Sequence, residues 1–250
     1  MTRRVAVLVC GLTLLAAGRA SAQLSAWNDR GFLNLSGAGQ TGTSKDLTFD
    51  SSNTPGFGFV VYGENANVGA RRSVTGGGGI FDVTAGARVW NNLGAAISFW
   101  RRSDNADATV TASIPDPAFF DKPRSVATSI SGLTHKEKWV AVLGVFTVPM
   151  TDKIDVMVLA GPAVVSVDHE IPTGVSLSEG NSGPQLTFTR STLSKSTWGY
   201  QLGVDGRYMI TKMLGAGMFL RLSKATSDLS NAVSLESGGF QAGIGLRVRF

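Results

Sequence analysis

The sequence predicts an all-β fold, a closed antiparallel up-and-down barrel of eight strands. Residues 240–250 alternate without a break between apolar side chains and glycine, glutamine or arginine, as a strand with two different faces does. Glycine is abundant, at 31 of 250 residues, and it disfavours helices but marks bends in curved sheets. From residue 80 onward, strand-like segments are joined alternately by short and by long connections. Together these features favour a barrel built from hairpins.

Three pairs of expected strands are joined by tight turns. The first turn is Asn91-Asn92, which suits a tight turn because asparagine tolerates positive φ. The others lie at 150–153 and 211–213. In the middle pair both faces are largely apolar, so the inward face is not assigned there. The eight strands are expected at 32–42, 81–89, 93–99, 138–148, 154–167, 198–208, 214–220 and 240–250.

The long connections are expected to be loops, because they are rich in Gly, Ser, Thr, Asp, Asn or Pro. The first contains two strand-like pieces, 46–50 and 57–62, which predict a hairpin above the barrel and leave a ten-stranded count as the main alternative. The expected loops are 43–79, 103–130, 168–195 and 225–238.

The N-terminus has the pattern of a cleaved export signal. Arg3 and Arg4 precede an apolar run, and Ala20-Ser21-Ala22 supplies small residues for cleavage after residue 22. We therefore expect a signal peptide at 1–22 and one barrel domain at 23–250. The single cysteine, Cys10, would leave with the signal, so no disulfide or thiolate metal site is expected. Without the signal's three arginines, 20 basic residues face 18 acidic ones, which gives no reason to expect nucleic acid as a partner.

The expected strands also fit a bilayer. No segment of 23–250 supplies the 18 consecutive apolar residues of a membrane helix. Eleven strand residues tilted by about 45° climb roughly 25 Å, which is the height of the apolar band of membrane barrels. Aromatic side chains fall near strand ends, as two interfacial girdles would place them: Phe99, Trp198 and Tyr200 near the loops, and Trp90, Tyr208 and Phe250 near the turns.

The segment 245–250, Gly-Leu-Arg-Val-Arg-Phe, resembles the closing-strand signal of bacterial outer-membrane β-barrels, through Gly245, Val248 and Phe250. Ile244 stands where that signal usually has a polar residue. In layout the chain is similar to the eight-stranded superfamily that includes OmpA-type and OmpW-type barrels. The resemblance implies a cell outer-membrane location, periplasmic turns, extracellular loops and recognition of the closing strand by the barrel assembly machinery. It implies no specific activity.

Seven charged residues are expected to face the barrel interior. An eight-stranded barrel is only wide enough for side chains to fill it, and buried charges must pair or form hydrogen bonds. We therefore expect a polar network that plugs the lumen. A channel for small or apolar solutes is the alternative, favoured if Leu143, Val145, Met157 and Leu159 line the lumen. The expected network residues are Asp82, Arg88, Asp205, Arg207, Arg221, Arg247 and Arg249.

Four cations flank one hairpin at the expected outer interface: Arg101, Arg102, Lys136 and Lys138. They are suited to lipopolysaccharide phosphates, and an ordinary solvated rim is the equal alternative. Phe119-Phe120, in the loop between these strands, would either cap the loops or contact an extracellular partner.

No motif predicts catalysis, a cofactor or a metal site. Residues 37–42 match G-x-G-x-x-G, but another strand-like piece follows instead of the helix that a dinucleotide needs. Gly76–Gly79 lacks the Lys-Ser or Lys-Thr of a phosphate loop. We expect His169, between Asp168 and Glu170, at a solvated loop edge, and we find no nucleophile at a recognisable spacing from His135.

The expected function is therefore a structural or surface-interaction role in the outer membrane, in contact with its lipid and lipopolysaccharide. Besides the channel, two less favoured alternatives stay open. One is a soluble exported ligand-binding barrel of lipocalin type, because alternation alone also permits the apolar face to turn inward. The other is an outer-membrane enzyme that modifies lipids.

Overall fold

The computed structural model describes residues 28–41, 45–50, 57–74, 78–180, 183–230 and 233–250. The expected signal peptide lies outside these ranges. Within them no helix is long and apolar enough to cross a membrane. The strands are β1 (Gly31–Thr41), β2 (Lys45–Phe49), β3 (Gly58–Val61), β4 (Glu64–Val74), β5 (Gly79–Trp90), β6 (Leu93–Ile114), β7 (Arg124–Pro149), β8 (Ile154–Gly180), β9 (Gly183–Met209), β10 (Leu214–Ser230) and β11 (Val233–Arg249).

Eight of these strands close into a ring. Strands β5 to β11 pair in chain order, each antiparallel to the next. Strand β1 pairs with β5 on one side and with β11 on the other, from Phe32 opposite Arg249 to Thr41 opposite Phe240. The chain therefore folds as a closed antiparallel up-and-down β-barrel of eight strands, which confirms the predicted fold class. The ten-stranded count is wrong for the ring.

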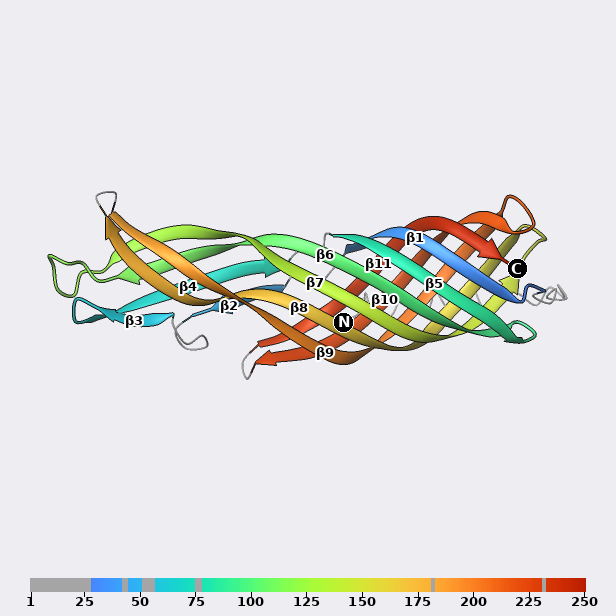
Figure 1. The fold of residues 1–250 in the computed structure, drawn as a ribbon, viewed down its shortest axis with the longest axis horizontal. Coiled ribbons are helices and arrows are strands. Elements are labelled where there is room, and N and C mark those ends of the chain that lie inside the picture. Colours follow the sequence, from blue (N-terminus) through green and yellow to red (C-terminus); the bar gives the residue numbers. More distant parts are fainter. Residues whose placement is uncertain (1–27, 42–44, 51–56, 75–77, 181–182, 231–232) are drawn as a thin grey trace, which may run out of the picture.

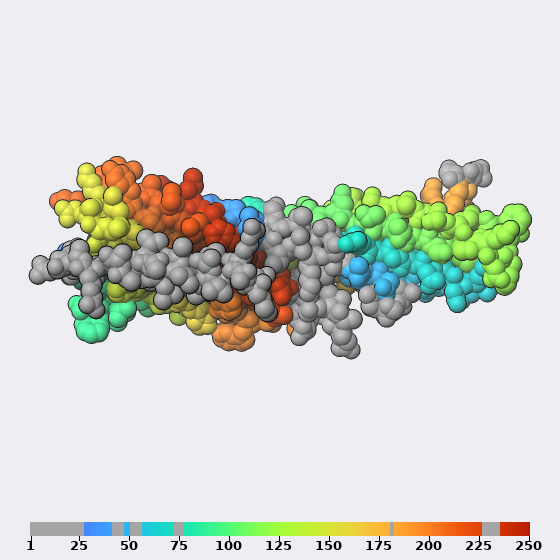
Figure 2. Space-filling view, turned by 180° about the vertical axis from the view of Figure 1, so that it is seen from behind, coloured from blue at the N-terminus to red at the C-terminus, as the bar shows by residue number. Residues whose placement is uncertain are grey.

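Long strands carry the structure well past the ring (Figure 1). Strand β8 has 27 residues, which at about 3.3 Å per residue and a tilt of about 45° span roughly 60 Å, twice the roughly 30 Å of a bilayer's hydrocarbon core. Strand β4 pairs with the far half of β6, from Asn67 opposite Ser113 to Arg72 opposite Ala108. Strands β2 and β3 pair with β4. We call residues 45–74, 103–135 and 168–194, where described, the extension; its far end is built by β3, β4 and the β6–β7 hairpin (Figure 2).

Most of the predicted loops are strands. Residues 103–114, 124–130, 168–180, 183–195, 225–230 and 233–238 continue β6 to β11. Residues 43–44, 51–56, 75–77, 181–182 and 231–232 of those loops lie outside the described ranges. The predicted pieces at 46–50 and 57–62 largely coincide with β2 and β3. The composition was misread because serine and threonine, typical of loops, also cover the outer face of a strand in water.

The reason that the strands continue can be followed along β6. Near the ring its outward residues are apolar, with Ile97 and Phe99 exposed. From Arg101 onward the exposed positions become polar, through Thr109, Thr111 and Ser113. The buried positions change in the opposite sense, from Ser98 near the ring to the apolar set Ala108, Val110, Ala112 and Ile114 in the extension. The strand is thus built for lipid outside in one half and for water outside in the other.

The short turns follow from single side chains. Asn91 has a φ of 46°, which the β5–β6 turn requires and asparagine tolerates. In the β7–β8 turn, the hydroxyl oxygen of Thr151 accepts hydrogen bonds from the backbone N–H groups of Lys153, at 3.3 Å, and Ile154, at 3.0 Å. The β9–β10 turn repeats this arrangement with Thr211. Each hydroxyl replaces ladder hydrogen bonds where the chain reverses.

The seam between β1 and β11 requires glycine at position 245. A Cβ atom there would collide with the carbonyl oxygen of Leu35 and lie 2.6 Å from Cα of Ser36. The seam has no room for a side chain at this point. A Cβ atom at Gly37, close by on β1, would meet nothing within 4 Å.

We predict that Gly245→Ala destabilises the barrel by about 1–3 kcal/mol, because the strands must separate to admit the methyl group. The measurement is the urea midpoint of protein refolded into lipid vesicles without assembly machinery. Gly37→Ala is the matched control and should leave the midpoint unchanged. Wild-type stability of the refolded Gly245→Ala protein would contradict this packing argument and would leave recognition during assembly as the reason for the glycine.

Candidate functional site

The candidate site is the buried polar interior of the barrel. Its best-defined interaction joins Arg247 of β11 to Asp205 of β9, with Nη2–Oδ2 and Nε–Oδ1 distances of 2.8 and 2.9 Å. Nη1 of the same guanidinium donates to Ser36 of β1 at 2.9 Å. Arg247 is fully buried, so this two-point contact compensates its charge in the interior.

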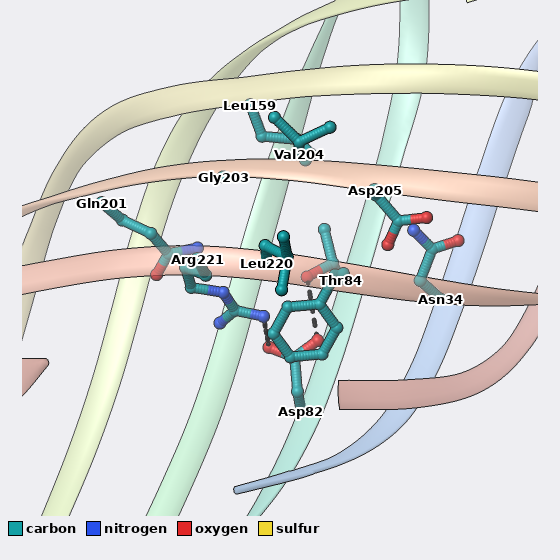
Figure 3. A pocket seen from close by; sticks show the side chains of 11 residues that line it. Asn34, Asp82, Thr84, Leu159, Gln201, Gly203, Val204, Asp205, Leu220 and Arg221 are labelled. Atoms are coloured by element: carbon teal, nitrogen blue, oxygen red, sulfur yellow. Dashed lines mark hydrogen bonds and ion pairs between the residues drawn. The ribbon is translucent and has the colours of Figure 1, made fainter. Parts of the chain in front are cut away.

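A second ion pair crosses the barrel nearer to the extension than the first. Arg221 of β10 donates to Asp82 of β5 at 2.7 Å, although 139 residues separate them (Figure 3). Hydroxyl groups of Thr84 and Ser98 lie on the same carboxylate, each at 3.4 Å. Arg221 also lies over the Phe219 ring, 4.4 Å from its centroid. Asp82 therefore gathers donors from three strands, β5, β6 and β10.

The third ion pair lies toward the turns. Arg207 of β9 donates to Asp155 of β8, and both side chains are buried. Arg249 lies farther out and only half-buried, 3.9 Å from Asp155 and 3.7 Å from Asp29. Arg88 is also half-buried, at the turn end of β5. Of the seven charged residues expected inside, five are thus deeply buried in ion pairs, and Arg88 and Arg249 lie at the mouth.

The facing wall of the interior is apolar. Strands β7 and β8 point Leu143, Val145, Met157 and Leu159 inward, and all four are buried. Between the ion-paired wall and this wall remains a cavity of about 20 Å³, lined by residues that include Asn34, Asp82, Leu159 and Asp205 (Figure 3). A water molecule needs roughly 10–15 Å³ by the same measure, so the cavity has room for about one water.

A stacked tryptophan pair lies in the interior where the ring meets the extension. Trp100 and Trp139 are directly opposite each other on β6 and β7, with ring centroids 4.9 Å apart and planes 12° from parallel. Both are fully buried. The Trp100 N–H donates to Gln201 at 3.3 Å on one side, and the Trp139 N–H donates to Glu137 at 3.1 Å on the other. We call this pair the tryptophan seal.

Three of the four cations expected at the outer interface are exposed there. Arg101 lies opposite Lys138 on neighbouring strands, and Lys136 is two residues farther along. Arg102 is a correction. It is buried and points inward, 3.2 Å from Asp104 and 4.0 Å from Glu137. Adjacent strand residues point to opposite faces, so Arg101 and Arg102 cannot share the outer surface.

The histidine prediction was wrong. His169 is buried in the extension instead of lying at a solvated edge, because β8 continues to Gly180. His135 lies directly opposite on β7, and their Nδ1 atoms are 3.0 Å apart. Burial, the nearby positive charge of Arg72 and the His135 ring lower the pKa of His169 from 6.5 to about 3. Among the described residues, no group of three or more His, Cys, Asp and Glu side chains is placed to hold a metal ion.

The described parts of the two glycine motifs lie in or beside strands, and the aromatic pair of the β6–β7 hairpin lies at a hairpin end. Residues 37–41 lie in β1 and β2 follows, so this G-x-G-x-x-G match lacks the helix that a dinucleotide needs. Gly76–Gly77 lie outside the described ranges, and Gly79 begins β5. Phe119 and Phe120 are exposed at the end of the β6–β7 hairpin.

Sequence reasoning missed Arg72, Glu137, Asp155 and the tryptophan seal. A usable signal was present in the ambiguous strands. His135, Glu137 and Trp139 share one alternation phase with Leu143 and Val145. Charged residues at the end of an apolar phase indicate the protected face, since lipid would not accept them. Arg72 lies in a predicted loop, so its strand and face were not predicted.

No protein-family model and no curated protein sequence matches the chain. Solved structures with a similar layout include Neisserial surface protein A, at 11% identity and TM-score 0.47, over 88% of this chain and 97% of that one. OprG from Pseudomonas aeruginosa has 11% identity and TM-score 0.44, over 89% and 96%. The outer membrane protease OmpT from Escherichia coli has 11% identity and TM-score 0.40, over 92% and 99%. Likeness at this level does not decide activity or partners.

Two measurements test whether the interior is a locked polar plug. The unmodified protein should show no steady conductance in a planar bilayer. Asp205→Ala should lower its stability by about 3–5 kcal/mol, because Arg247 is left buried without its partner. Asp152→Ala, which removes an exposed turn carboxylate, should change it by less than about 0.5 kcal/mol. A large, steady, ion-selective conductance in the unmodified protein would overturn the plug.

Proposed function

We propose that the protein is an outer-membrane barrel with a structural, surface-interaction role and no catalytic activity. In this role a closed ring anchors the chain and holds the long extension outside the cell. The observation that carries the proposal is the reversal of side-chain polarity along the strands. Apolar side chains face outward around the ring, and polar ones face outward in the extension. A soluble barrel of lipocalin type has no reason to turn so many apolar side chains outward.

The height of the apolar band supports the membrane assignment. Exposed apolar side chains on β9 run from Trp198 through Leu202 and Val204 to Tyr208. This stretch of 11 residues climbs roughly 25 Å at a tilt of about 45°, which matches the apolar band of outer-membrane barrels. The aromatic rings at its two ends occupy the positions of interfacial girdles.

Location and orientation can be tested by labelling single cysteines in intact cells, in a Cys10→Ser background. A cysteine at Phe119, at the far end of the extension, should react with a membrane-impermeant thiol reagent. The matched control at Asn91, in the β5–β6 turn, should react only after the cells are lysed, because it faces the periplasm. The reverse labelling pattern, or recovery of the protein in the soluble fraction, would contradict the proposal.

One observation favours the channel alternative. The buried side chains of Leu143, Val145, Met157 and Leu159 line one wall of the interior. Of that wall, Leu159 lines a cavity with room for about one water, together with Arg221 and Asp82 of one ion pair and Asp205 of another. A solute would have to displace both the ion pairs and the tryptophan seal. The filled interior therefore favours an anchor over a conduit.

Lipopolysaccharide is the partner that best fits the outer rim, and we include this contact in the proposal. Arg101, Lys136 and Lys138 lie just beyond the apolar band, next to exposed Val140 on the same face, with the Asp168 carboxylate 4.0 Å from Lys138. Lipid phosphates lie at this level, beside the headgroup-facing aromatics. Arg102 takes no part, because it points into the barrel.

Replacing Arg101, Lys136 and Lys138 together with serine should weaken binding of lipopolysaccharide roughly 100-fold, at about 1 kcal/mol per cation near an anionic surface. The control is a triple serine variant at Arg190, Lys153 and Lys212, which removes the same charge elsewhere. Binding is measured by titrating purified lipopolysaccharide, with and without its lipid phosphates, into the refolded protein. Equal losses in the two variants would leave the cations as an ordinary solvated rim.

A further inference from the structure

Beyond the tryptophan seal, four buried side chains form a continuous hydrogen-bonded series, which we call the histidine chain. It runs from Arg72 of β4 through His169 of β8 and His135 of β7 to Glu137 of β7. Each is at most 3% exposed. The distances are 3.2 Å from Arg72 Nη1 to His169 Nε2, 3.0 Å between the two Nδ1 atoms, and 2.9 Å from His135 Nε2 to Glu137 Oε1.

The chemistry of its ends fixes the direction of every hydrogen bond. Arginine only donates, so His169 Nε2 must accept and His169 carries its proton on Nδ1. That proton points at His135 Nδ1, which must therefore accept and leave the His135 proton on Nε2. This N–H donates to Glu137, whose other oxygen accepts from Trp139 at 3.1 Å. Both imidazoles are neutral in this arrangement, and both carboxylate oxygens of Glu137 accept a hydrogen bond.

An additional proton on either ring breaks the series. A cationic imidazole donates from both nitrogens. A proton on His169 Nε2 would face the Arg72 guanidinium, and a proton on His135 Nδ1 would face the N–H of His169. The switch to the other His169 tautomer gives no relief, because it also points an N–H at Arg72. Burial leaves little water to accept the misplaced proton.

Charged groups on the neighbouring elements lie around the histidine chain. Strand β4 contributes Arg72, and β6 contributes Arg102 and Asp104. Strand β7 contributes Glu137, while the Glu170 carboxylate of β8 accepts a hydrogen bond from the Thr134 N–H at 3.0 Å. Leu193 of β9 lies opposite His169, and Lys195 nearby is exposed. The charge in direct contact with His169 is therefore the cation Arg72.

Arg72 also connects two parts of the extension that do not pair with each other. Its Nη2 donates to the Leu133 carbonyl of β7 at 2.7 Å, and its Nη1 donates to the Glu170 carbonyl of β8 at 3.0 Å. In the described residues, β4 pairs with β2, β3 and β6. Arg72 thus reaches across the extension and holds β4 against β7 and β8, over buried Val68, Ala70 and Leu133.

We propose that the histidine chain is an acid-sensitive latch, which holds β2–β4 against β7 and β8 at neutral pH and releases them when His169 gains a proton. The ring below the tryptophan seal stays closed in both states. The proposal concerns the extension alone, so it stands or falls independently of the proposed lipopolysaccharide contact.

The sign of the pH dependence follows from the lowered pKa of His169, about 3 in the closed state against an ordinary value of about 6.5. The released state binds the proton more tightly. The latch is therefore at full strength above about pH 6.5 and weakens as the pH falls toward 3. One proton shifts the ratio of released to closed extension by up to tenfold per pH unit, or about 50-fold between pH 6.5 and 4.5.

Imidazole ¹⁵N spectra of the refolded full chain test the hydrogen-bond directions directly, because the protein has only two histidines. At pH 7.5 we expect one ring protonated on Nδ1, His169, and one protonated on Nε2, His135, with assignment by the single His135→Gln variant. A cationic ring at pH 7.5, or the opposite tautomers, would overturn the proposal. This readout stands even if a variant disturbs the extension.

Release is measured as the distance between spin labels at Asn65→Cys on β4 and Ser176→Cys on β8, in a Cys10→Ser background. The distribution should be narrow at pH 7.5 and broad at pH 4.5, while labels at Asp152→Cys and Lys212→Cys, exposed in two of the turns, stay unchanged. His135→Gln with His169→Gln should abolish the pH dependence, whether its distribution is narrow or broad. An unchanged wild-type distribution at pH 4.5, or a pH dependence that persists in the double variant, would overturn the latch.

Discussion

The closure of β1 on β11 is the constraint on which the rest of the structure depends. Backbone polar groups cannot be left without hydrogen bonds in hydrocarbon, so a sheet can cross a membrane only as a closed ring. Ten residue pairs form this seam, and the Phe250 carbonyl accepts from the N–H groups of Arg30 and Gly31 at 2.7 and 2.8 Å. A ring of eight is narrow, and its interior must be filled by side chains. The three buried ion pairs and the absence of room for a Cβ atom at Gly245 both follow from that narrowness.

The outer faces of the same strands contact lipid in one half and water in the other, and this explains their unusual length. Within the ring, lipid outside requires apolar outward residues, and the polar groups turn inward, where they must pair. Beyond Arg101 water replaces lipid, so the ordinary rule for soluble proteins returns and the apolar residues form a core. This change in the polarity of the two strand faces occurs next to the tryptophan seal. Its indole N–H groups donate to Gln201 on one side and to Glu137 on the other. The two indole rings thereby lie between a polar part and a largely apolar part of the interior without leaving an indole N–H unsatisfied.

Sequence alternation predicted the ring well because each ring strand has faces of clearly different polarity. The strand at 240–250 and the Asn91 turn depend on local rules, namely side-chain direction and permitted φ. Interior pairs such as Arg221 with Asp82 could be predicted only as a set, because 139 residues separate the partners and the pairing depends on how the ring closes. The extension was missed because its outward serines and threonines look like loop residues. His135 and His169 then met only through the register of β7 and β8, which no local pattern fixes.

The histidine chain lies in the extension and not in the ring, and the two environments explain why. In the ring each buried cation has a carboxylate partner, so removing one group leaves a full charge unpaired in a narrow, lipid-surrounded interior. That arrangement stabilises one state. In the histidine chain, two imidazoles lie between Arg72 and Glu137. The two charged side chains are therefore connected only by hydrogen bonds through groups that can bind a proton. A histidine side chain ordinarily changes its charge near neutral pH, whereas arginine and aspartate side chains ordinarily do so far from neutral pH. The ring is thus built to stay closed, whereas the histidine chain is a buried network whose hydrogen bonds an additional proton breaks.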